Sequence, residues 1–194
     1  MSDHPGGSLP VSRRWFGSAL SGRGFLPLSI VLMALFYAVL YHPYSTESLP
    51  GRALGAYLQF VAAGSAALLR WFGEDISVQG TTVLGRFPYV VVLDCAALDA
   101  QALFAAAVLA FPVSLRDKLI GLVGGLCAIW CINVARLGLL YFAGANSLHL
   151  FQVLHEEVMV MLVIVSVCGL FVAWARWAHA RTSLPAAASV ADAE

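Results

Sequence analysis

Long apolar runs separated by short polar stretches dominate this chain. Several of the runs are long enough, or nearly so, to cross about 30 Å of hydrocarbon as helices. They cover residues 26–42, 53–72, 96–113, 119–143 and 153–178. The pattern therefore predicts an all-α integral membrane protein with four to five transmembrane helices.

The run at 53–72 differs from the other four. Its bulky residues fall on one helical face and its small or polar residues on another. That division suits a helix that lies at the membrane surface or packs with one small-residue face, although the run could also span. We expect four spans plus a surface helix, whereas hydropathy alone counts five.

A short extended segment precedes Cys95. Residues 76–94 combine β-branched and aromatic residues with Gly80 and Gly85, which predicts one or two short strands or an extended hairpin. Open strands cannot face lipid, so this segment lies in water or on the membrane surface.

Composition places these elements in one membrane domain. Residues are 60% hydrophobic and 11% charged, and the zero formal net charge gives no support for nucleic-acid binding. The membrane domain is expected at 26–180, between a flexible basic tail at 1–25 and a disordered tail at 181–194. The four cysteines form no CxxC pair and no zinc-type spacing, and no metal or organic cofactor is expected.

Basic residues predict which way the second half of the chain is oriented. Lys and Arg at 114–118 and at 176–181 place both segments in the cytoplasm. Cys95, Arg136 and His155 then fall in one layer near the outer face, each from a different span. The arginines of the N-terminal tail favour an inside N-terminus, which agrees with four spans and a surface helix at 53–72.

Arg136 is the most unusual residue of the apolar runs. A charge at the centre of a spanning helix costs about 2.5–3.5 kcal/mol and usually marks a functional site. Beside it, a Cys95 thiolate could act as a nucleophile, with His155 transferring the proton. Arg136 could stabilise both the thiolate and an oxyanion. This set is sufficient for acyl transfer from a peptide bond.

Other roles for the same residues stay open. Cys95 could be a packed thiol, and His155 could sit among lipid headgroups. Arg136 could form a structural ion pair with Asp94, Glu156 or Glu157. The protein would then be a non-catalytic membrane scaffold in a secretion or surface-polymer assembly. A carrier with Arg136 as an anion site is less favoured, because no inverted repeat is visible.

Two further polar residues could support the site. Asn133, one turn before Arg136, could donate a hydrogen bond to a substrate carbonyl or join two helices. Asp99, one turn beyond Cys95, would raise the pKa of the thiol unless Arg136 neutralises it, or could itself pair with Arg136. His149 is a less well-placed alternative to His155.

The ordered set of motifs from 26 to 178 resembles the exosortase/archaeosortase family, most closely its short members. The matching features are Cys95 at a helix start, the basic turn at 114–118, Asn133-x-x-Arg136, and His155 beginning the last span. The chain departs from the family pattern after the cysteine, where Ala96 and Ala97 replace a small polar residue and a glycine.

The resemblance implies a membrane-embedded cysteine protease or transpeptidase, a hydrolase acting on peptide bonds. Its partners would be the lipid bilayer and the C-terminal sorting-signal helix of exported proteins. It would lie in a bacterial or archaeal cytoplasmic (inner) membrane as a multi-pass protein with its active site on the outer side. Cys95, Arg136 and His155 would be catalytic, with Asn133 and Asp99 supporting them. The acceptor of the acyl group, whether water, an amine or a lipid, is left open.

Overall fold

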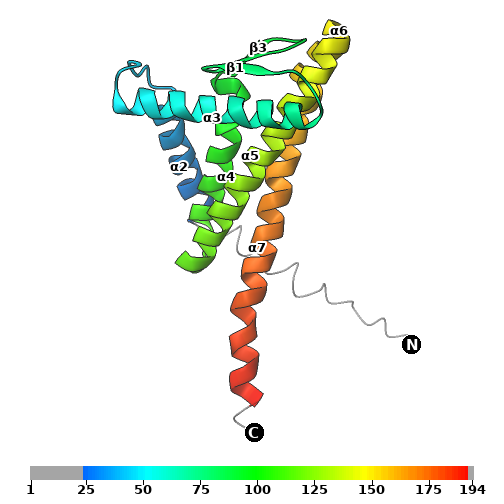
Figure 1. Cartoon of the computed structure of the whole chain (residues 1–194). Coiled ribbons are helices and arrows are strands. Elements are labelled where there is room, and N and C mark those ends of the chain that lie inside the picture. The colour runs from blue at the N-terminus through cyan, green and yellow to red at the C-terminus, as the bar shows by residue number, and fades with distance from the viewer. Residues whose placement is uncertain (1–23, 192–194) are drawn as a thin grey trace, which may run out of the picture.

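Four helices form the body of this protein. The computed structural model describes residues 24–191, with the backbone alone at Glu156, Glu157 and from Thr182 onward. Of the four helices, α4 contacts α2, α5 and α7 (Figure 1). Their bounds are Phe25–Leu40 for α2, Leu98–Ala110 for α4, Leu115–Asn146 for α5 and Met159–Ala191 for α7. Nearly all of the predicted N-terminal tail lies outside the described residues.

Helix α3 (Leu49–Trp71) lies crosswise over one end of this bundle (Figure 1). Ser48 caps its first turn by accepting a hydrogen bond from the Gly51 backbone at 3.2 Å, and Pro50 occupies the first turn. Since the other long helices run along the bundle, the crosswise orientation favours the predicted surface position for α3.

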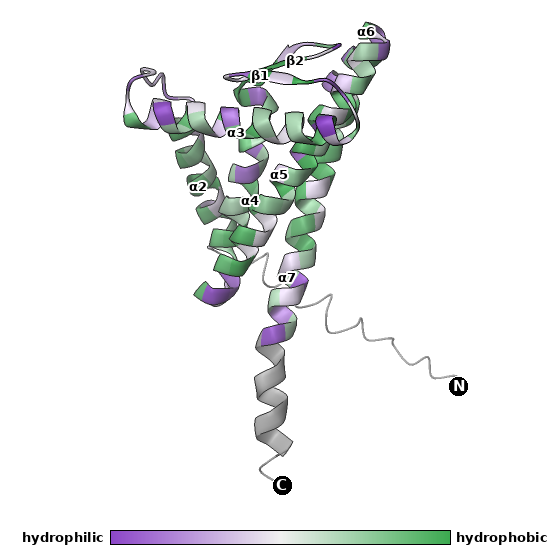
Figure 2. Cartoon of the chain, viewed as in Figure 1, coloured by the Kyte–Doolittle hydropathy of each residue, from purple (hydrophilic) through white to green (hydrophobic). Residues whose placement is uncertain are grey.

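The membrane character predicted from the sequence is confirmed, whereas the number of spans stays a prediction. Within the described residues, α3, α5 and α7 are long and apolar enough to cross a membrane. Helices α2 and α4 are apolar but shorter, and the 16 residues of α2 extend about 24 Å. Hydrophobic residues cover the middle of the bundle, and hydrophilic residues gather at the lower end of α5 and on the last coloured turns of α7 (Figure 2).

A three-stranded antiparallel sheet, β1-β2-β3, lies beside α3 at the same end of the molecule (Figure 1). Val83 in the central strand pairs with Val78 on one side and Tyr89 on the other. Gly80 has φ 62° in the tight turn between β1 and β2, a conformation that favours glycine. The strands are β1 (Ser77–Gln79), β2 (Thr82–Leu84) and β3 (Tyr89–Val90). The extended segment predicted before Cys95 is confirmed, but it forms three strands, where one or two strands or a hairpin were predicted.

Two apolar cores divide the molecule along the bundle. The core of the sheet end joins α3, the sheet and the second half of α5 around Val61, Leu69, Val83, Leu137 and Tyr141. The core of the other end joins α4, α5 and α7 around Phe104, Val108, Phe111, Ile129 and Trp174. We call this second region the basic end, because it includes Arg116, Lys118, Arg176 and Arg181.

The polar stretch at 144–152, between the last two apolar runs, would be expected to form a loop, but it is helical. Helix α5 continues to Asn146, and a further helix α6 (Leu148–Val153) follows at once. Ser147 separates the two, and its hydroxyl caps α6 by accepting from the Leu150 backbone at 3.4 Å. A π-helical turn, η2 (Leu154–Val158), then connects α6 to α7. The polar residues of this segment therefore end one helix and cap the next.

Candidate functional site

Cys95 ends a short 3₁₀ turn, η1 (Leu93–Cys95), which follows the sheet. The thiol is half-buried, and α4 begins three residues later at Leu98. Between them Ala97 adopts the left-handed conformation, with φ 53° and ψ 27°. For a residue with a β-carbon this conformation costs about 1–2 kcal/mol. It is the position at which the resembled family has glycine.

Side chains from three helices hold the backbone around the thiol. From α5, Asn133 Nδ2 donates to the Cys95 carbonyl at 2.9 Å. From α3, the Tyr57 hydroxyl donates to the Ala96 carbonyl at 3.2 Å, and it accepts from Gln101 Nε2 of α4 at 2.6 Å. The cysteine backbone is therefore fixed before any substrate binds.

Arg136 is buried, with 7% of its surface exposed, one turn beyond Asn133 on α5. Its Nη1 is 3.5 Å from the Asn133 Oδ1, a long contact, and its Nε has no hydrogen-bond partner among the described residues. Asn133 therefore links the arginine to the backbone of the cysteine.

Asp99 has a different partner. Its two carboxylate oxygens accept from the Tyr41 hydroxyl at 3.2 and 3.1 Å. No ion pair to Arg136 occurs among the side chains that the structure describes, which do not include those of Glu156 and Glu157. The structural ion pair with either glutamate stays a prediction.

Cys95 and His155 line the same cavity, which we call the thiol chamber. Its volume is about 140 Å³, and its walls come from the sheet, α5 and α6. His155 is half-buried in the π-helical turn η2, and its ring contacts the Phe151 ring edge to face at 5.4 Å. Single π-turns inside helices often occur at functional sites. The other chamber residues are Phe87, Tyr89, Val90, Leu137, Leu140 and Tyr141.

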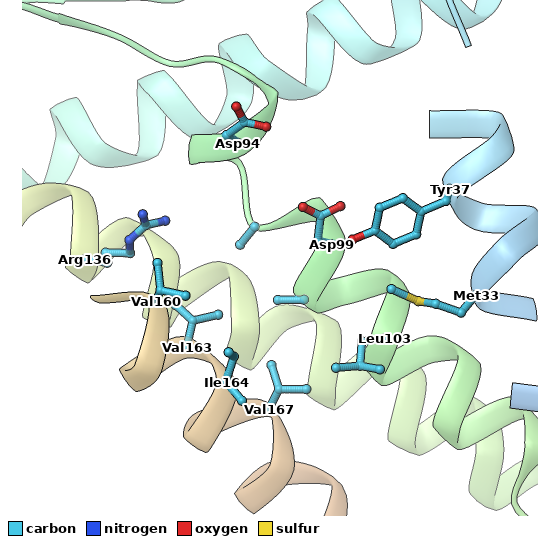
Figure 3. A pocket seen from close by; sticks show the side chains of 12 residues that line it. Met33, Tyr37, Asp94, Asp99, Leu103, Arg136, Val160, Val163, Ile164 and Val167 are labelled. Atoms are coloured by element: carbon cyan, nitrogen blue, oxygen red, sulfur yellow. The ribbon is translucent and has the colours of Figure 1, made fainter. Parts of the chain in front are cut away.

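Arg136 lines a second, larger cavity, which we call the arginine pocket. It has a volume of about 390 Å³ and opens between α2, α4 and α7. Asp94 and Asp99 line it with Arg136 (Figure 3). The structure thus divides the other four predicted site residues around Cys95, with His155 in the thiol chamber, Arg136 and Asp99 in the arginine pocket, and Asn133 lining neither. His149 is exposed on α6 and lines neither cavity.

A polar network fastens the sheet over the thiol chamber. The Tyr141 hydroxyl donates to Glu74 Oε2 at 2.9 Å and accepts from the Arg86 backbone at 3.1 Å. The Arg86 Nε donates to the same Glu74 oxygen at 2.9 Å. The hydrogen bonds from Arg86 hold the pKa of Glu74 below its ordinary value, and that from Tyr141 acts in the same direction. This network joins the end of α3, the segment after β2 and α5.

Sequence reasoning missed the tyrosines of this site. Tyr57, Tyr89 and Tyr141 read as apolar residues of helices or strands, and only the fold brings their hydroxyls to Ala96, Ser65 and Glu74. Burial raises the pKa of Tyr89, whose hydroxyl donates to Ser65 Oγ at 2.8 Å. Across the described residues, no group of three His, Cys, Asp or Glu side chains is placed to hold a metal ion.

Fold and site together define a mostly helical membrane protein with a thiol and an imidazole in one small cavity below a surface sheet. The family model for transmembrane exosortases matches residues 7–172. The chain therefore belongs to the transmembrane exosortase family. No match is found among curated proteins or among solved structures.

Proposed function

We propose that this exosortase is a cysteine transpeptidase or protease that cleaves C-terminal sorting signals of exported proteins at the outer face of the membrane. The observation that carries the proposal is the thiol chamber, which brings Cys95 and His155 together from η1 and from η2. Family membership supports a protein substrate. That the substrate is a sorting signal is inferred from the family resemblance alone, because the chemistry of the thiol chamber requires only a peptide bond.

The reaction begins with attack of the Cys95 sulfur on the scissile carbonyl. His155 takes the thiol proton, and the tetrahedral intermediate collapses when the C–N bond breaks. The proton on His155 goes to the leaving amine, which leaves a thioester on Cys95. Water, an amine or a lipid nucleophile then attacks the thioester carbonyl, and the thiol is regenerated.

Arg136 acts from the neighbouring pocket. From there its guanidinium can stabilise the negative charge that develops on the oxygen of the tetrahedral intermediate, and this effect is stronger in a low-dielectric site than in water. One amide hydrogen of Asn133 already binds the Cys95 carbonyl. We therefore assign Asn133 the role of positioning residue, since it fixes both the cysteine backbone and the arginine.

The size of the thiol chamber limits what can enter. About 140 Å³ corresponds to roughly five water molecules at about 30 Å³ each, which is room for one side chain or one peptide unit. A folded domain cannot enter, whereas an extended segment next to a membrane helix can. This restriction fits cleavage at a short linear motif.

A cell that carries a tagged substrate tests the proposal. Cys95→Ser should leave the precursor uncleaved, while immunoblotting shows normal insertion of the variant. Cys127→Ser is the matched control, because Cys127 is an exposed thiol of α5 outside both cavities. Normal processing by Cys95→Ser would exclude the nucleophile.

A non-catalytic scaffold is the second candidate. The observation that favours it is that Arg136 lies outside the thiol chamber. A scaffold predicts that Cys95→Ser retains assembly of the secretion or surface-polymer machinery, whereas Arg136→Met loses it. An enzyme predicts that both substitutions abolish processing.

A further inference from the structure

The arginine pocket has a form that the peptidase reaction does not require. It is an open groove on α4, with α2 along one side and α7 along the other. Met33 and Tyr37 line it from α2, and a face of α7 lines it opposite them (Figure 3). The groove therefore connects the polar surroundings of Cys95 with the lipid-facing side of the bundle.

Charged and aliphatic residues occupy different parts of the groove. Arg136 and Asp99 face each other across it, with Asp94 above them and Tyr37 beside Asp99, and most of the other lining side chains are aliphatic (Figure 3). The wall from α7 is a stripe at helical spacing, made of Val160, Val163, Ile164 and Val167. Val160 and Ile164 are 47% and 48% exposed, whereas Val163 and Val167 pack toward the core, so the outer edge of this stripe is left uncovered by the described protein. The complementary ligand is an amphiphile with a charged head and an aliphatic tail.

The head must carry both signs of charge. Arg136 is more than nine-tenths buried, and its Nε lacks a partner among the described residues, so an anionic oxygen would satisfy it. Asp94 and Asp99 present carboxylates on the other side, and an ammonium group would neutralise them. Asp94 makes no side-chain hydrogen bond to another described residue, which leaves it available.

We infer that the arginine pocket binds one zwitterionic phospholipid with a primary amine. The phosphate lies against Arg136, the ammonium lies against Asp94 and Asp99, and one acyl chain follows the aliphatic stripe of α7. This inference does not depend on peptide cleavage, and binding can be measured without any substrate.

Size and chemistry favour this lipid over other occupants. A volume of about 390 Å³ is near the lower end for small-molecule sites, and it is too small for a helix about 10 Å across. Lipids with net negative charge would meet two carboxylates against one guanidinium. Choline lipids are recognised by aromatic cages, and Tyr37 is the sole aromatic side chain among the described lining residues. A primary ammonium, by contrast, donates hydrogen bonds to carboxylates.

Native mass spectrometry of the full chain tests the site. The protein is released from detergent with equimolar phosphatidylethanolamine, phosphatidylcholine and phosphatidylglycerol, and the retained lipids are counted. We expect one retained phosphatidylethanolamine, with about a tenfold preference over phosphatidylcholine, the size expected for a charge-assisted hydrogen bond. Equal retention of the three lipids, or preference for phosphatidylglycerol, would overturn the inference.

Two variants with matched controls locate the lipid. Asp99→Asn keeps an acceptor for Tyr41 but removes the charge, so it should erase most of the ethanolamine preference, whereas Glu47→Gln in an exposed loop should not. Val163→Phe fills the tail region and should lower retention of all three lipids. Val123→Phe, on an exposed part of α5, should retain them. Unchanged retention in both Asp99→Asn and Val163→Phe would remove the lipid from this pocket.

Discussion

The sheet end and the basic end of this exosortase are held together by different interactions. At the sheet end, hydroxyl, amide and carboxylate groups fix the backbone, and Tyr57, Asn133 and Tyr141 each join two or more segments. The first two hold the segment that carries Cys95, and Tyr141 holds the segments at Glu74 and Arg86 next to the sheet. Polar side chains in this region therefore determine where the thiol lies.

At the basic end, rings pack against helix backbone. Gly121 faces the Trp174 ring and Gly125 faces the Phe104 ring, and a β-carbon at either glycine would collide with it. Polar contacts add to this packing, and Trp174 Nε1 donates to the Asp117 carbonyl at 3.1 Å. Close approach of α5 to α4 and α7 is what holds this region.

This difference suggests that the sheet end mainly determines activity and that the basic end mainly determines stability. Substitutions at the sheet end should change the reaction more than the folding, because polar contacts to the thiol segment are made by few atoms. Substitutions at the basic end should change folding first, because tight ring packing tolerates little added volume. The following predictions test that separation.

The largest effect is expected at His155. Removal of a general acid–base residue lowers a rate by about 10²–10⁴-fold, so His155→Gln should nearly abolish processing of a tagged substrate. Its thermal unfolding in detergent should change little, because the ring is half-buried. His149→Gln is the matched control, since His149 is exposed and lines neither cavity. Equal loss in both variants would contradict the assignment.

A stability effect of the next size is expected at Gly125. Gly125→Val drives two methyl groups into the Phe104 ring and should lower the free energy of unfolding by about 1–3 kcal/mol. Gly124→Val is the control, because a β-carbon at Gly124 meets no atom within 4 Å. The pair is compared by thermal unfolding in the same detergent. Similar midpoints for the two variants would show that α4 and α5 are not tightly packed.

Much of the fold could be predicted because membrane helices and the hairpin leave strong sequence signals. Apolar runs indicated α2, α4, α5 and α7, and β-branched residues around Gly80 indicated the sheet. The segment at 144–152 could not be predicted as helix α6, because its polar residues are typical of loops as well as of caps. Residue propensities do not distinguish a loop from a helix cap. The contact between Phe87 and Phe151 helps to place α6, but it is a tertiary interaction that the local sequence does not reveal.

The sequence indicated which residues form the candidate site, but it did not indicate how they are arranged in space. Shared depth in the membrane indicated that Cys95, Arg136 and His155 lie near one another, but depth says nothing about direction around a helix. Asn133 lies between the arginine and the cysteine backbone, and Arg136 and Cys95 line different cavities. Tyr57 had no signal at all, because its hydrogen bond to Ala96 depends on the crosswise placement of α3.

A smaller, pH-dependent effect is expected from the network over the thiol chamber. The pKa of Glu74 is lowered in the folded protein, chiefly by hydrogen bonds from Arg86, so its contribution to stability is present above the unfolded value near 4.5. That contribution is lost as the pH falls through the lower folded value. The difference in melting temperature between the natural protein and Glu74→Gln should therefore shrink below about pH 4. A difference that is constant from pH 7 to pH 3 would show that the ionised carboxylate is not involved.

The smallest effect is expected at Ala97, and its size follows from opposing terms. Glycine would relieve about 1–2 kcal/mol of left-handed strain, but it adds about 0.5–1 kcal/mol of backbone entropy and loses about 0.8 kcal/mol of methyl burial. Ala97→Gly should thus change the free energy of unfolding by less than about 1 kcal/mol. Ala96→Gly has the same two costs without relief, since Ala96 is fully buried at φ −90°, and it should destabilise by about 1–2 kcal/mol. The difference between the two variants, measured by chemical unfolding, isolates the strain beside the thiol. If both variants destabilise the protein equally, Ala97 is not strained. Burial of its methyl group would then not be what offsets an unfavourable backbone conformation at the position of the family glycine.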